Sequence, residues 1–214
     1  MAKQSKRYRE LFSAITYLRK HLLPRNFDST GTYWRAKSVH LASLSFRMLV
    51  HAEIESYLED RSFELFERGW NAWDKSGSSS HVLVGLLAYS AIQLHPPPKR
   101  LGGDPERQQS YEDVKQPLQK AQSGWRKVHK DNHGIKEEHV LALLLPLGIS
   151  SSLLDTILLA NLSSYGIARG AVAHVPYRIT EQCDPKTEFE RASNIVNDLA
   201  GLDKILDDRL LLIP

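Results

Sequence analysis

The sequence predicts an all-α fold, and two observations carry this prediction. Apolar residues recur at three- and four-residue spacing along most of the 214-residue chain. No segment alternates apolar and polar residues for long enough to indicate a β-strand. We therefore expect one helical bundle, in which an amino-terminal helical arm (1–34) packs on a larger helical unit (35–214).

The individual helices follow from the apolar pattern and from the residues that interrupt it. Pro24 ends the first apolar stripe, and the Pro-rich, Gly-containing run 95–103 is expected to be a long loop between helices. Pro117 fits poorly inside the helix expected after that loop and is expected to break it. Hydroxyls in Ser150–Ser152 are expected to cap the helix that follows them. The expected helices span 8–18, 34–73, 81–93, 111–130, 136–145, 151–173 and 188–212.

Composition narrows the class of protein without choosing a function. The net charge of +3 permits an RNA partner but does not demand one. The single cysteine, Cys183, excludes an intrachain disulfide, so a reducing cytoplasmic setting is the expectation. The amino terminus lacks the apolar run of a signal peptide. The most apolar stretch, 140–149, is too short to span a bilayer, so we expect a soluble protein with no membrane partner.

Several familiar catalytic patterns are missing. The chain has no phosphate-binding GxxxxGK[ST] loop, no GxGxxG, no HExxH and no GxSxG. His133 and His139 lie near acidic residues, but their spacing matches no common metal-ligand pattern, so we expect neither a metal nor a cofactor. His51, inside the long second helix, is expected at the edge of the core.

One segment near the carboxyl end stands out. Arg169 and His174 are separated by four small or apolar residues at the end of an apolar helix. An Arg among Ala, Gly and Val needs a partner if it is buried. The spacing alone is weak, because Arg35 and His40 share it, and Arg126 and His133 match a looser form. Only the pair at 169 and 174 lies at the end of an apolar helix directly before the last helix. We therefore take this pair as the candidate site because of its place in the chain.

Three pieces of the chain resemble the HEPN superfamily, and within it the RiboL-PSP type of HEPN ribonuclease. The first is Phe46-Arg-Met-Leu-Val-His-Ala-Glu-Ile-Glu-Ser-Tyr-Leu58, which is similar to the family's early helix. The second spans 132–149 and looks like the segment before the family's motif helix. The third is Arg169…His174, which fits the family's R-x4–6-H signature. Together they cover roughly residues 40 to 212.

The resemblance implies a metal-independent endoribonuclease, such as a toxin or an anti-phage defence effector. In this role His174 would exchange protons near neutral pH. Arg169 would hold the scissile phosphate and stabilise charge in the transition state. Cellular RNA such as tRNA would be the substrate. The resemblance also implies a homodimer and a cognate antitoxin or other regulatory protein as partners.

Two residues and one angle leave alternatives open. Gly170 stands where the family usually carries a polar residue, and Glu55 on the early helix is a supporting candidate. Arg169 and His174 differ by about 140° of helix rotation, so either the helix bends at Gly170 or the site combines two subunits. The alternatives are a non-catalytic HEPN module that binds RNA or a partner protein, and a structural domain in which Arg169 pairs with a carboxylate.

Overall fold

The computed structural model describes residues 4–28, 37–90, 115–174 and 183–214, apart from the side chains of 172–174. Within these ranges the chain forms helices and connecting turns and no β-strand, which confirms the all-α prediction. The Pro-rich run 95–103 lies outside the described residues. Short 3-10 turns η4 (Leu145–Leu147) and η5 (Ser151–Leu153) separate two of the helices. The helices are α1 (Lys6–Leu22), α2 (Lys37–Ser76), α3 (His81–Tyr89), α4 (Lys115–Lys130), α5 (Glu137–Leu144), α6 (Thr156–His174) and α7 (Pro185–Leu211).

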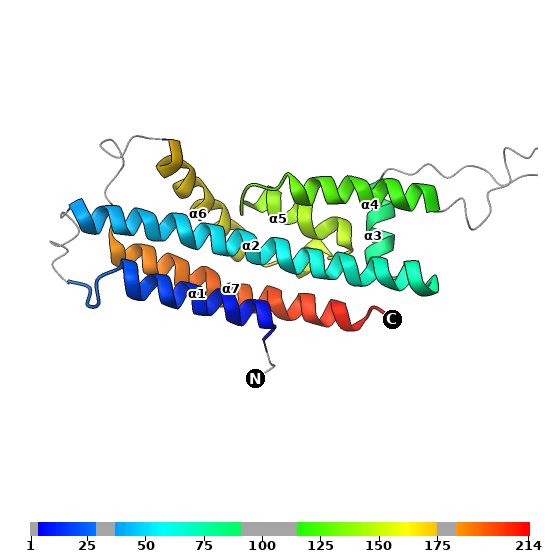
Figure 1. Cartoon of the computed structure of the whole chain (residues 1–214), viewed down its shortest axis with the longest axis horizontal. Coiled ribbons are helices and arrows are strands. Elements are labelled where there is room, and N and C mark those ends of the chain that lie inside the picture. Colours follow the sequence, from blue (N-terminus) through cyan, green and yellow to red (C-terminus); the bar gives the residue numbers. More distant parts are fainter. Residues whose placement is uncertain (1–3, 29–36, 91–114, 175–182) are drawn as a thin grey trace, which may run out of the picture.

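The long helix α2 is the axis of the bundle (Figure 1). Its 40 residues extend for about 60 Å at 1.5 Å per residue. Helices α1 and α7 run along one side of α2, whereas α3, α4 and α5 cover the opposite side of its carboxyl-terminal half. Helix α6 crosses the amino-terminal half of α2 and also contacts α5 and α7. Because helices pack on α2 from both sides, apolar residues are buried around much of its circumference.

Helix α1 is held on the bundle by apolar and polar contacts. Leu11 and Ile15 are buried in the shared core, as the apolar stripe predicts. At its start, the backbone N–H of Ser5 donates to Asp203 Oδ2 of α7 at 2.8 Å. The fully buried Asp203 also accepts from the Tyr57 hydroxyl at 2.9 Å and lies 3.2 Å from the Nε of Arg61, so it ties α1, α2 and α7 together.

Two local predictions need correction. Pro117 does not break α4, because the described helix runs from Lys115 through the proline to Lys130 without interruption, with the proline in the first turn of that span. The hydroxyl of Ser150 caps the short turn η5 and not α6. The carboxylate of Asp155 caps α6 instead, accepting from the N–H of Ile157 at 2.7 Å and of Leu158 at 3.3 Å.

A close backbone contact fixes the turn that leads from α5 towards α6. Gly148 has a φ of +77°, a left-handed conformation that favours glycine. A Cβ added at Gly85 of α3 would meet the backbone N of Gly148 at 2.4 Å. Both glycines are therefore required for α3 to dock on this turn. None of the helices that the structure describes has the length and apolar composition of a membrane-spanning segment.

Candidate functional site

Arg169 lies on the inward face of α6, one turn beyond the fully buried Tyr165. The residue is half-buried, and its Nε is buried without a hydrogen-bond partner among the described residues. It forms no ion pair with any carboxylate in the described ranges. A buried guanidinium N–H costs stability unless a water, an ion or a ligand supplies an acceptor.

On α2, the positive charge of Arg169 acts on His51 and Glu55, which lie one helical turn apart. His51 is 2% exposed, and its Nδ1 lies 3.5 Å from Glu55 Oε2 without forming a hydrogen bond. Burial, followed by the positive charge of Arg169 and of His139, lowers the pKa of His51 to about 4. The imidazole is therefore neutral at physiological pH.

Glu55 has an environment that favours its protonated form. Its side chain is 19% exposed, and burial, followed by the negative charge of Glu59, raises its pKa. Arg169 and His133 act in the opposite direction but do not cancel the effect. Glu59 is itself held in place, since its Oε1 accepts from the Asn132 amide at 2.7 Å. Glu55 thus keeps a proton more readily than an ordinary carboxyl group.

The segment that precedes α5 packs against α6 and carries further nitrogen-containing side chains. A Cβ added at Gly166 of α6 would lie 3.2 Å from the Cγ of Lys136. The first N–H of α5, at Glu137, donates to the Ser163 hydroxyl of α6 at 2.9 Å, so the two helices are docked directly. The positive charge of His139 acts on His51 and that of His133 acts on Glu55, so this segment adds groups that can carry positive charge near the pair on α2.

A buried ion pair holds the end of α6 that carries Arg169. Arg47 of α2 donates from Nη2 to Glu188 Oε1 of α7 at 2.6 Å, and Glu188 is 2% exposed. The Nη1 of Arg47 also donates to the carbonyl of Ala168 at 3.3 Å. The residue before Arg169 is therefore fixed to both α2 and α7.

The other predicted site residues have different outcomes. Helix α6 continues without interruption through Gly170 to His174, and an added Cβ at Gly170 would meet nothing within 4 Å in the described part. Regular helix geometry therefore keeps positions 169 and 174 about 140° apart. The side chain of His174 lies outside the described residues. The positive charge of Arg169 acts on Glu55, whose supporting role stays a prediction.

Of the two competing Arg and His pairs, the structure describes both residues of one and only the His of the other. Arg35 lies outside the described residues, and His40 Nδ1 accepts from the backbone N–H of Cys183 at 3.2 Å. The guanidinium carbon of Arg126 lies 5.0 Å from the ring centre of Phe66, so this residue covers the core.

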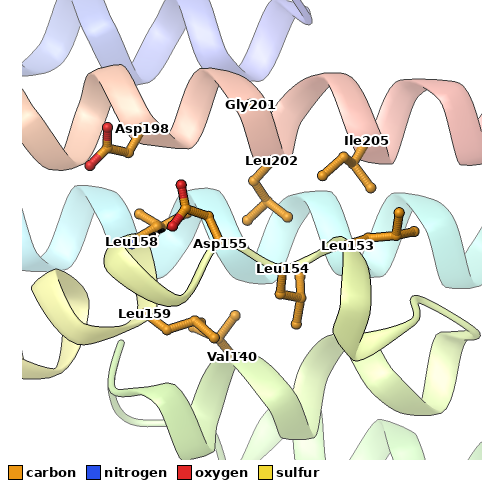
Figure 2. A pocket seen from close by; sticks show the side chains of 10 residues that line it. All are labelled: Val140, Leu153, Leu154, Asp155, Leu158, Leu159, Asp198, Gly201, Leu202 and Ile205. Atoms are coloured by element: carbon orange, nitrogen blue, oxygen red, sulfur yellow. Dashed lines mark hydrogen bonds between the residues drawn. The ribbon is translucent and has the colours of Figure 1, made fainter.

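A separate hollow lies between α5, α7 and the start of α6 (Figure 2). Its volume is about 110 Å³, and Leu, Val and Ile side chains form most of its wall. The polar side chains in its lining are the carboxylates of Asp155 and Asp198. Negative charge beside an apolar wall disfavours a phosphate, so this hollow does not compete with Arg169 for a nucleic acid. Within the described ranges, no three His, Cys, Asp or Glu side chains gather as a possible metal site.

The sequence contained one signal for the missed part of the site. His51, Glu55 and Glu59 follow one another at four-residue spacing, which places all three along one side of a helix. Comparison of the chain with known protein families, curated proteins and solved structures gives no match. The fold and the site together define the class of this protein: it is all-α, with Arg169 on α6 and with His51 and Glu55 on α2, the helix that α6 crosses.

Proposed function

We propose that this protein is an endoribonuclease that cleaves RNA through attack of the ribose 2′-hydroxyl. The observation that carries the proposal is the half-buried Arg169: among the described residues its Nε has no hydrogen-bond partner and it forms no ion pair with a carboxylate, while its charge acts on His51 and Glu55. An arginine held in this way suits a phosphodiester, because the phosphate oxygens can accept the hydrogen bond that the Arg169 Nε–H does not make within the described residues. The resemblance to HEPN ribonucleases at the same residue supports the same activity.

The proposed chemistry assigns a separate role to each predicted residue. Arg169 binds the non-bridging oxygens of the scissile phosphate and stabilises the charge that accumulates in the transition state. His174 exchanges a proton with the reacting oxygens near neutral pH, without a metal ion. The products carry a 2′,3′-cyclic phosphate and a 5′-hydroxyl. DNA lacks the 2′-hydroxyl and is not cleaved.

We further propose that two copies of the chain pair through the outer face of α6. This face presents an exposed stripe at alternating three- and four-residue steps, with Ile157 at 68% and Ile167 at 62% exposure. Ala160, Ser164 and Ala171 complete the stripe and allow a close approach of a second helix. Position 174 continues the same spacing. A dimer of this kind supplies the second subunit that the 140° offset calls for, and a regulatory protein or antitoxin would compete for the same face.

The test is a cleavage assay on total cellular RNA, including tRNA, in the presence of EDTA. Wild-type protein is expected to produce new 5′-hydroxyl ends, whereas Arg169→Ala and His174→Ala are expected to lose at least about 100-fold in rate. Arg68, an exposed arginine on the far part of α2, supplies the matched control Arg68→Ala. Full activity in Arg169→Ala would refute the site. Salt-dependent RNA binding without new ends would identify the non-catalytic module instead.

A further inference from the structure

The proposed reaction requires two proton transfers, and the proposed function assigns His174 one of them. One proton leaves the 2′-hydroxyl, and another must reach the departing 5′-oxygen. A single histidine cannot do both at the same moment. Resting on the proposed function, we infer that Glu55 is the general base that accepts the 2′-hydroxyl proton, and that His51 positions its carboxylate towards the phosphate held by Arg169.

The carboxylate of Glu55 differs from two other carboxylates, Glu59 and Glu188, in having no hydrogen-bond donor bound to it among the described residues. The carboxylate of Glu59 is engaged by Asn132, at 2.7 Å, and that of Glu188 is engaged by Arg47, at 2.6 Å. In the described part, Glu55 has no hydrogen bond and no arginine or lysine ion pair, and its Oε2 lies 3.5 Å from the His51 Nδ1. Of these three carboxylates, Glu55 is thus the one left free to take a proton.

His51 is suited to positioning rather than to catalysis. Its side chain is 3% exposed, so a substrate does not reach it. Because the imidazole is neutral, it orients Glu55 without an ion pair that would weaken the carboxylate as a base. A neutral ring with its hydrogen on Nδ1 can donate to Oε2 after a small adjustment of the 3.5 Å separation.

The charged and titratable groups around Glu55 come from every neighbouring element. Glu59 and His51 lie on α2, Arg169 lies on α6, and His133 precedes α5. Burial and Glu59 raise the pKa of Glu55, which makes it a stronger base than an exposed carboxylate. The positive charge of Arg169 has the opposite effect, and a bound phosphate would offset that charge.

The reaction balances as an internal transesterification. The Glu55 carboxylate takes the proton of the 2′-hydroxyl, and the electron pair left on the 2′-oxygen forms a bond to phosphorus. The bond from phosphorus to the 5′-oxygen breaks, and that oxygen takes a proton from the His174 imidazolium. Glu55 ends protonated and His174 ends neutral, and exchange with solvent restores both groups. No oxidant, reductant or further reactant is needed.

The first experiment measures kcat/KM for RNA cleavage against pH. Wild-type activity is expected to rise with pH through an acidic limb that belongs to Glu55. Glu55→Gln is expected to lose about 100- to 10,000-fold in rate together with that limb. Glu59→Gln removes the neighbouring like charge, so it is expected to move the limb to lower pH. Glu53→Gln, on another side of α2, is the matched control and is expected to retain the wild-type profile.

The second experiment separates the base from the acid. RNA in which sulfur replaces the 5′-oxygen at the mapped cleavage site has a leaving group that needs no proton. His174→Ala is expected to recover most of its rate on this substrate, whereas Glu55→Gln is expected to stay slow. His51→Gln is expected to lower kcat, with little change in KM, on both substrates, because its defect lies in the orientation of the base. Glu55→Asp, which keeps a carboxylate, replaces Glu55→Gln if that variant does not fold.

The outcomes distinguish the two proposals. If Glu55→Gln keeps the wild-type pH profile, or recovers on the sulfur substrate, Glu55 is not the base, although a dead Arg169→Ala would still support the endoribonuclease. If wild-type protein cuts neither substrate, both proposals are overturned.

Discussion

The buried imidazole of His51 makes the stability of this protein depend on pH in a predictable way. Its pKa is lowered from 6.5 to about 4 in the folded state, so unfolding takes up a proton between these values. A group of this kind supports the fold fully above pH 6.5, and that support is lost as the pH falls towards 4. Linkage gives a loss of about 2 kcal/mol at pH 5 relative to pH 7.

The assay compares urea unfolding of wild-type protein and His51→Asn at pH 7 and pH 5. The variant has no titrating ring, so it does not lose this stability as the pH falls. The free energy of unfolding of the variant minus that of wild type is therefore expected to be about 2 kcal/mol higher at pH 5 than at pH 7. Glu55 titrates with the opposite sign, because its raised pKa removes stability as pH rises, but it is present in both proteins. Exposed His21 provides the control His21→Asn, which should follow the wild-type curve. An unchanged gap between wild type and His51→Asn would show that His51 is not buried beside a cation.

The remaining predictions concern packing and a buried charge. Gly85→Ala is expected to lower the free energy of unfolding by about 1–3 kcal/mol or more, because its Cβ would meet backbone of Gly148. Gly124→Ala, with nothing within 4 Å, is expected to raise it by up to about 1 kcal/mol, and a shift of the same sign in both variants would contradict the helix docking. Arg61→Met leaves the fully buried Asp203 without its cation and is expected to cost about 3–5 kcal/mol in urea unfolding. Adding Asp203→Asn should recover much of that loss, and a cost under about 1 kcal/mol for the single variant would show that the pair is not buried.

Apolar periodicity predicts the helices well because each helix buries a face that local sequence defines. The stripe containing Leu11 and Ile15 predicts α1, and the same reasoning gives the order of the helices that follow. Helix ends are predicted less well. Both Ser150 and Asp155 are chemically able to cap a helix, and only the packing of η5 decides between them.

The site is harder to predict because its parts come together only in the folded chain. Arg169 could be selected from its position and its small neighbours, whereas its partners on α2 depend on the angle at which α6 crosses that helix. Spacing places His51 and Glu55 on one side of α2 but does not say which helix that side meets. Spacing within one helix therefore pairs Arg169 with His174, whereas the groups on which its charge acts lie on α2.

The uninterrupted course of α2 also restricts how the chain can change in length. Along one helix it carries the Arg47 anchor, the His51 and Glu55 pair and the Arg61 ion pair, each directed at a different neighbour. One residue inserted between Glu55 and Arg61 would rotate the following part by about 100° and separate the site from the buried network. Seven inserted residues would restore the angle to within about 20° but lengthen the helix by about 10 Å. Insertions and deletions that keep the protein intact are therefore confined to the connections between helices. The spacing of residues along α2 fixes where each neighbouring helix packs.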